Sequence, residues 1–98
     1  MLNMVEVMNL SEGNPGAMTF LFSLISAPKF GDSKVIIEKV KKLAITGSDL
    51  YVLWSDLGGR SLSRVKEICE KVADHILIDA CSRQDYSGRE LIKEYMEV

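Results

Sequence analysis

A run of apolar residues that begins at a strong helix start places the tightest constraint on the fold of this chain. Asn14 is a preferred N-cap, and Pro15 suits the first helical turn. The predicted helix runs to about Ala27, because Pro28 prevents its continuation. Apolar side chains cover nearly its whole circumference, so we expect it at the centre of the fold or at an oligomer contact.

The composition is that of one globular domain. The chain has 98 residues, 47% hydrophobic and 27% charged, which argues against intrinsic disorder and leaves no room for a second core. We treat residues 1–98 as a single domain, with 1–7 a candidate N-terminal extension that fits a helix or an edge strand equally well. Because one core of this size is small, we expect a homo-oligomer.

Helix signals recur along the rest of the chain. Asp32 or Ser33 caps a helix that ends near Gly47. Ser61 caps another, whose inward residues run from Leu62 to Val72. A last helix opens with a capping box and buries four apolar residues (Ser87 to Glu90; Leu91, Ile92, Tyr95 and Met96).

Two apolar runs, 50–54 and 76–79, fit either a helix or a buried strand. Ser48 as N-cap and Gly58 as C-cap favour a helix for the first run. The predicted fold class is therefore mainly α, a compact bundle of about five short helices. The alternative is an α+β fold with strands at those two places.

Charge, cysteine content and hydropathy narrow the class of partner and compartment. The net charge is −2 with scattered Lys and Arg, so duplex nucleic acid is not an expected partner. Cys69 and Cys81 do not make a disulfide framework, and we expect two reduced thiols in a cytoplasmic protein. The longest mostly apolar stretch, Ala17 to Ala27, is about half a membrane span, so membrane insertion is not expected.

No residue pattern points to catalysis or to a metal. The single histidine, His75, lies six residues from each cysteine, a spacing that suits neither a zinc site nor a Cys–His pair. We interpret it as a surface residue. The sequence thus predicts a non-enzymatic protein with no metal and no cofactor.

The segment from Ser11 to Gly16 is the one local feature that suggests a ligand. Glycines flank a helix start, so backbone N–H groups and the helix dipole can face an anion. The segment lacks P-loop spacing, and the alternative is a tight turn before a capped helix. Arg60 adds a guanidinium beside another helix start. The candidate ligand-binding residues are Ser11, Glu12, Gly13, Asn14, Gly16 and Arg60.

A second set of residues is predicted to form an interface. Tyr51 and Trp54 are of residue types that dominate contact hot spots, and three further candidates lie on the apolar helix. The set is Met18, Phe22, Ile25, Tyr51 and Trp54. The alternative is that these side chains belong to the core.

The run Met8-Asn9-Leu10-Ser11-Glu12-Gly13-Asn14-Pro15-Gly16-Ala17 resembles the opening of a group of short phage and prophage proteins without an assigned activity. Their downstream segment resembles Gly47 to Asp56, although Ser55 here replaces a Lys and Leu57 a Cys. The resemblance covers Met8 to Leu62. It implies phage or prophage origin and favours Met8 as the ancestral start.

Three functional hypotheses follow. The first is a phage accessory protein that acts by binding, for example in counter-defence by sequestering a host protein or a small anionic nucleotide signal. The second is a small virion or assembly component whose first helix packs between subunits. The third is a helix-turn-helix regulator built on Ser48–Leu57 and Leu62–Val72, for which Arg60, Arg64 and Lys66 are a thin supply of cations.

Overall fold

Helices account for all the regular secondary structure in the part of the chain that the computed structural model describes, residues 4–27, 32–58, 60–82 and 92–96. The mainly α prediction is confirmed. Both ambiguous runs are helical, since 50–54 lies within α4 and 76–79 within α5, so the α+β alternative is wrong. The elements are α1 (Met4–Leu10), α2 (Pro15–Ile25), α3 (Ser33–Lys42), α4 (Gly47–Asp56), α5 (Leu62–Ser82) and a short helical segment at 92–96.

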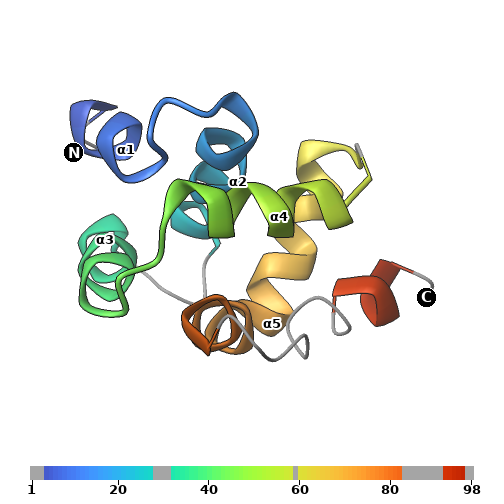
Figure 1. Cartoon of the computed structure of the whole chain (residues 1–98). Helices are drawn as coiled ribbons and strands as arrows, with labels where there is room; N and C mark the ends of the chain where they lie inside the picture. The colour runs from blue at the N-terminus through green and yellow to red at the C-terminus, as the bar shows by residue number, and fades with distance from the viewer. Residues whose placement is uncertain (1–3, 28–31, 59, 83–91, 97–98) are drawn as a thin grey trace.

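Helix α2 is the centre of the fold, as its all-round apolar character predicts. Its start has the expected chemistry, because the Asn14 side chain accepts a hydrogen bond from the Ala17 N–H at 3.1 Å and Pro15 opens the first turn. It packs against α1, α3, α4 and α5, which surround it in Figure 1. It ends at Ile25, two residues before the predicted end. Its completely buried core residues are Ala17, Phe20, Leu21 and Leu24.

The boundaries of α3 and α4 differ from the sequence predictions. Asp32 caps α3 as expected, but α3 ends at Lys42 rather than near Gly47, because Ala44 adopts a left-handed conformation with φ of 54°. The N-cap of α4 is Thr46, not Ser48, and Thr46 forms a reciprocal capping box with Asp49. Gly58, with φ of 60°, ends α4 as predicted.

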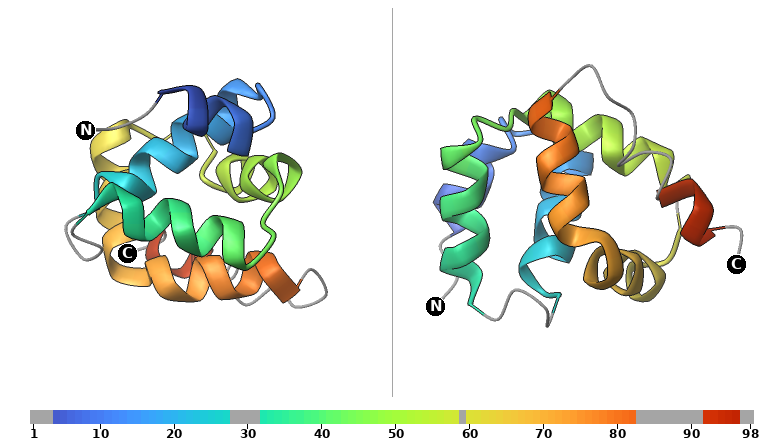
Figure 2. Two further views of the ribbon diagram at one scale, coloured as in Figure 1. Left: turned by 90° about the vertical axis from the view of Figure 1, so that its left-hand side faces the viewer. Right: turned by 90° about the horizontal axis from the view of Figure 1, so that it is seen from below.

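Helix α5 continues through the place where a new element was predicted after Val72. Figure 2 shows that its two halves run in different directions. The first half packs near α4, and the second half lies beside α3, where Lys39 forms an ion pair with Asp74 at 2.9 Å. One long bent helix therefore takes the place of two predicted elements.

The N-terminal and C-terminal segments join the same core. Val7 on α1 and Ile92 in the 92–96 segment are both completely buried in one hydrophobic cluster with α2, α4 and α5. Tyr95 and Met96 pack partly against it, as predicted. Residues 4–7, which we treated as part of a candidate extension, form the beginning of α1. The predicted capping box at Ser87 to Glu90 and the buried Leu91 lie outside the described residues.

Candidate binding surface

The predicted anion loop is the junction between two helices, α1 and α2. The Glu12 N–H bonds to the Asn9 carbonyl and the Gly13 N–H to the Met8 carbonyl, the pattern of a Schellman cap that closes α1. Glu12 has the positive φ that this cap requires, 55°, and Gly13 after it has φ of 73°. The sequence predicts the start of α2 but not the end of α1, because no apolar periodicity settles the structure of the first seven residues.

Nearly all the amide donors of this loop serve the fold itself. The Ser11 N–H bonds to the Val7 carbonyl and the Asn14 N–H to the Ser11 carbonyl. Pro15 has no N–H, which leaves Gly16 as the one residue of this described stretch whose backbone donor has no hydrogen bond. The loop therefore offers an anion a single free amide. Its role as a ligand site stays a prediction.

The Glu12 side chain anchors α4 instead. Its carboxylate accepts a hydrogen bond from the Gly47 N–H at 2.6 Å, at the positive end of the α4 dipole. A Cβ atom on Gly47 would lie 2.5 Å from the Ser11 carbonyl oxygen and 2.6 Å from the Glu12 carboxylate. The contact thus needs a carboxylate at position 12 and no side chain at position 47, two residues that are 35 positions apart.

We predict that Glu12→Gln lowers the free energy of unfolding by about 1 kcal/mol, because it removes the charge from a hydrogen bond at a helix N-terminus. Urea unfolding followed by circular dichroism measures the change. Glu38→Gln, at an exposed position on α3, is the matched control and should change stability by less than about 0.5 kcal/mol. Equal effects of the two substitutions would contradict the anchoring role.

The second predicted ligand element, Arg60, follows the other end of α4 from the Glu12 contact. Glu12 contacts the first residue of α4, whereas the Arg60 N–H bonds to the carbonyl of Leu57, just past the last residue of α4. The ten residues of α4 span about 15 Å. Among the described residues, no hydrogen bond or ion pair joins Arg60 to the Ser11–Gly16 loop.

The predicted interface residues divide into two groups. Met18, Phe22 and Ile25 are half-buried on α2, and the last two pack against the core. On α4, Trp54 is half-buried, whereas Tyr51 keeps 46% of its surface exposed. The core alternative thus fits the α2 residues better than it fits Tyr51.

Gly16 explains how α4 lies so close to the start of α2. A Cβ atom on Gly16 would stand 2.5 Å from Cδ1 of Trp54 and 2.9 Å from Cδ1 of Tyr51. The absence of that atom lets both aromatic rings lie over the first turn of α2. Gly16 is therefore a packing residue as well as a predicted ligand residue.

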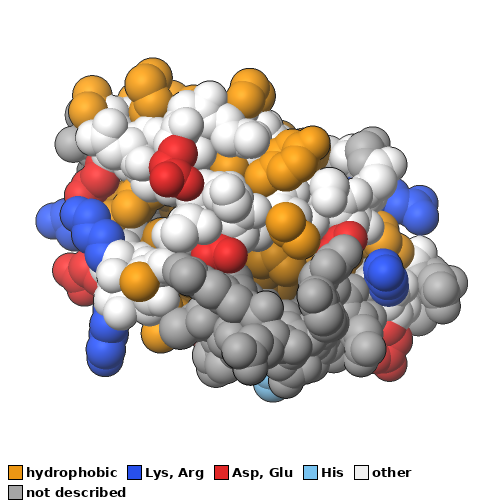
Figure 3. Space-filling view, in the orientation of Figure 1, with side chains coloured by type: hydrophobic (Ala, Val, Ile, Leu, Met, Phe, Trp, Pro, Cys, Tyr) orange, Lys and Arg blue, Asp and Glu red, His pale blue; other side chains and the backbone are white. Residues whose placement is uncertain are grey.

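Further apolar side chains, which the sequence did not predict to be exposed, lie at the surface of α4 and of α1. Val52 lies next to Tyr51 and is 40% exposed, and Met4, Val5 and Met8 lie exposed on α1. The exposed residues of α4 carry no charge (Ser48, Tyr51, Val52 and Ser55), and Asp49 and Asp56 lie half-buried at the edge of this surface. Figure 3 shows hydrophobic side chains along the upper edge and around α4, with Lys and Arg at the left and right margins of this face. We call the exposed part of α4, Tyr51 and Val52 with Ser48 and Ser55, the α4 face.

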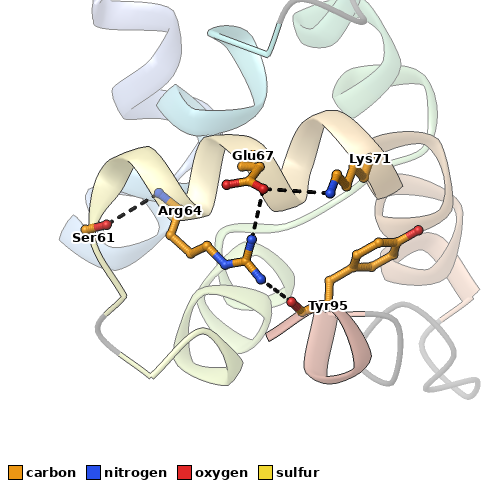
Figure 4. Close-up of polar contacts among 5 residues, drawn as sticks. All are labelled: Ser61, Arg64, Glu67, Lys71 and Tyr95. Atoms are coloured by element: carbon orange, nitrogen blue, oxygen red, sulfur yellow. Dashed lines mark hydrogen bonds and ion pairs between the residues drawn. The ribbon is translucent and has the colours of Figure 1, made fainter. Parts of the chain in front are cut away.

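The cation considered for nucleic acid binding, Arg64, is occupied within the chain. Its guanidinium pairs with Glu67 at 3.0 Å and donates to the Tyr95 carbonyl, while the Lys71 ammonium lies 5.6 Å from the centre of the Tyr95 ring (Figure 4). This network fastens the 92–96 segment to α5. Arg64 is thus held in a structural contact and does not point freely to solvent.

The remaining candidates for chemistry are a thiol and a histidine. Cys69 is a free, buried cysteine, and desolvation by burial raises its thiol pKa from 9.0 to about 12. His75 is exposed, as predicted.

Across the described ranges, no three His, Cys, Asp or Glu side chains gather as a metal would require. None of the described helices has the length and apolar character needed to cross a membrane.

Comparisons with known proteins add no relative. No protein-family model matches the chain, and neither a curated protein nor a solved structure matches it.

Proposed function

We propose that this protein is a non-enzymatic accessory protein of phage or prophage origin that acts by binding a host protein through the α4 face. The observation that carries the proposal is the exposure of Tyr51 and Val52, side by side on the α4 face, whose exposed residues are uncharged while Asp49 and Asp56 lie half-buried at its edge. Exposed apolar patches commonly mark protein interaction sites, and tyrosine is enriched among residues that dominate binding energy. The resemblance of its first segment to phage proteins supports the origin.

Two observations favour a protein partner over the other predicted partners. The chain's own helices already bury α2, so the fold does not need a second copy to cover its most apolar element. The loop before α2 retains a single free amide within the described residues, which makes it a weak acceptor of a nucleotide phosphate. The homo-oligomer and the nucleotide signal stay predictions, and the experiment below distinguishes a host protein from a second copy.

The α4 face can be tested by site-specific photocrosslinking in a bacterial host. We expect benzoylphenylalanine in place of Tyr51 to give one discrete adduct with a host protein, because an aromatic residue at this position lies in the contact. The same residue in place of Lys34, which is exposed on α3, is the matched control and should give none. Adding Val52→Asp should reduce the adduct about tenfold, since it places a charge in an apolar contact.

Three results would overturn the proposal. An adduct of twice the chain's own mass would show that a second copy occupies the α4 face. No adduct, or the same adduct from position 34, would show that the face contacts no specific partner.

A further inference from the structure

A cavity of about 370 Å³ lies between the end of α3 and the second half of α5, away from the α4 face. Its described lining is short: Lys39, Lys42, Leu43, Asp74 and Leu77. The volume is at the lower end of the range of small-molecule sites. The change of direction in α5, visible in Figure 2, brings its second half beside α3 and so forms this cavity.

The lining combines an apolar floor with a positively charged rim. Leu43, which is half-buried, supplies the accessible apolar surface, and Leu77, which is 1% exposed, lies beneath it. At the rim, Lys39 and Asp74 form an ion pair at 2.9 Å, so their charges compensate each other. The Lys42 ammonium is exposed and makes no ion pair with any described carboxylate, whereas the neighbouring Lys41 is paired with Glu6. Among the described lining residues, Lys42 is therefore the one cation without an ion pair.

We propose that this cavity binds a small amphipathic monoanion, a carboxylate on a medium-length aliphatic chain. The carboxylate pairs with the Lys42 ammonium, and the chain lies against Leu43, above the buried Leu77. A phosphate or other dianion fits less well, because the Asp74 carboxylate stands on the same rim and the aliphatic floor would stay uncovered. Each methylene buried there raises the affinity about fourfold, so the chain supplies most of the binding.

The experiment uses decanoate and the full-length protein. We expect isothermal titration calorimetry to show saturable binding of decanoate, and methyl NMR shifts to concentrate at Leu43 and Leu77. Lys42→Gln should weaken binding about tenfold, because it removes the unpaired ammonium. Lys34→Gln, an exposed lysine at the opposite end of α3, is the matched control and should leave the affinity unchanged. Decanol, which has the same chain and no charge, should bind the wild type about as weakly as decanoate binds Lys42→Gln.

Clear results would overturn this inference. Absence of binding at millimolar decanoate would exclude a site for this ligand. Equal binding by decanoate and decanol, or an unchanged affinity in Lys42→Gln, would show that Lys42 does not recognise the anion. Since Lys42 is exposed, circular dichroism can establish that the variant keeps its fold. The outcome does not depend on whether the α4 face binds a protein.

Discussion

Gly47→Ala is expected to lower the free energy of unfolding by about 2–3 kcal/mol, because the new methyl group has no space. Its Cβ would lie 2.5 Å from the Ser11 carbonyl oxygen, which is backbone and cannot turn away as a side chain can. To accommodate it, the Ser11–Gly13 turn must move away from α4 and the Glu12 hydrogen bond to the Gly47 N–H must lengthen. Urea unfolding measures the loss, with the fluorescence of the single tryptophan, Trp54, as one probe.

Two further variants separate the clash from other effects of the substitution. Gly58 has φ of +60° and open space around its Cβ position, so Gly58→Ala costs about 1–2 kcal/mol through backbone strain without a clash, whereas Gly47 has no positive φ and its substitution adds only the clash. Gly47→Ala in a Glu12→Ala background should keep most of its effect, since the Ser11 carbonyl remains in place. If Gly47→Ala leaves the free energy of unfolding unchanged, α4 does not sit as tightly on the loop as the structure indicates.

Cys69 is expected to react with iodoacetamide about 1000-fold more slowly in the folded protein than in the unfolded chain at pH 8. Burial raises its pKa from 9.0 to about 12, and the thiolate, which is the reacting form, becomes rarer by the same factor. The measurement uses a Cys81→Ser variant, so that Cys69 is the remaining thiol, with and without urea. Comparable rates in the two conditions would show that Cys69 is accessible in the folded state.

The same pKa shift predicts how stability depends on pH. A group whose pKa is raised by folding stabilises the folded state fully below its unfolded pKa, here 9.0, and loses that contribution as pH rises towards 12. The total loss is about 4 kcal/mol at 1.36 kcal/mol per pH unit. Other groups titrate in this range, so the test is the difference between the wild type and Cys69→Ala. That difference should be constant up to about pH 9 and then decline; a flat difference up to pH 12 would refute the shift.

The candidate site was only partly predictable, and the Ser11–Gly16 segment shows why. Glycines beside Asn14-Pro15 correctly predicted the start of α2. The same glycine at position 13 also completes the cap of α1, and Glu12 reaches a helix that begins 35 residues later. A local pattern contains no information about which distant backbone N–H group will face a side chain. The turn between α1 and α2, which has a structural role, therefore resembled a ligand-binding loop in the sequence. For the same reason, the sequence did not predict that the side chains of Val52 and Met8 are exposed.

By itself, the sequence determined the structural features that depend on residues within about four positions along the chain. The N-cap at Asn14, the first turn at Pro15 and the burial of α2 belong here, because capping bonds and helical periodicity are short-range. Only the tertiary structure decided that 76–79 continues α5 as a helix, that Gly47 touches the Ser11 carbonyl, and that Leu43 and Leu77 share a cavity. Those outcomes depend on how helices pack across the core, and packing between segments far apart in the chain is not set by any local pattern.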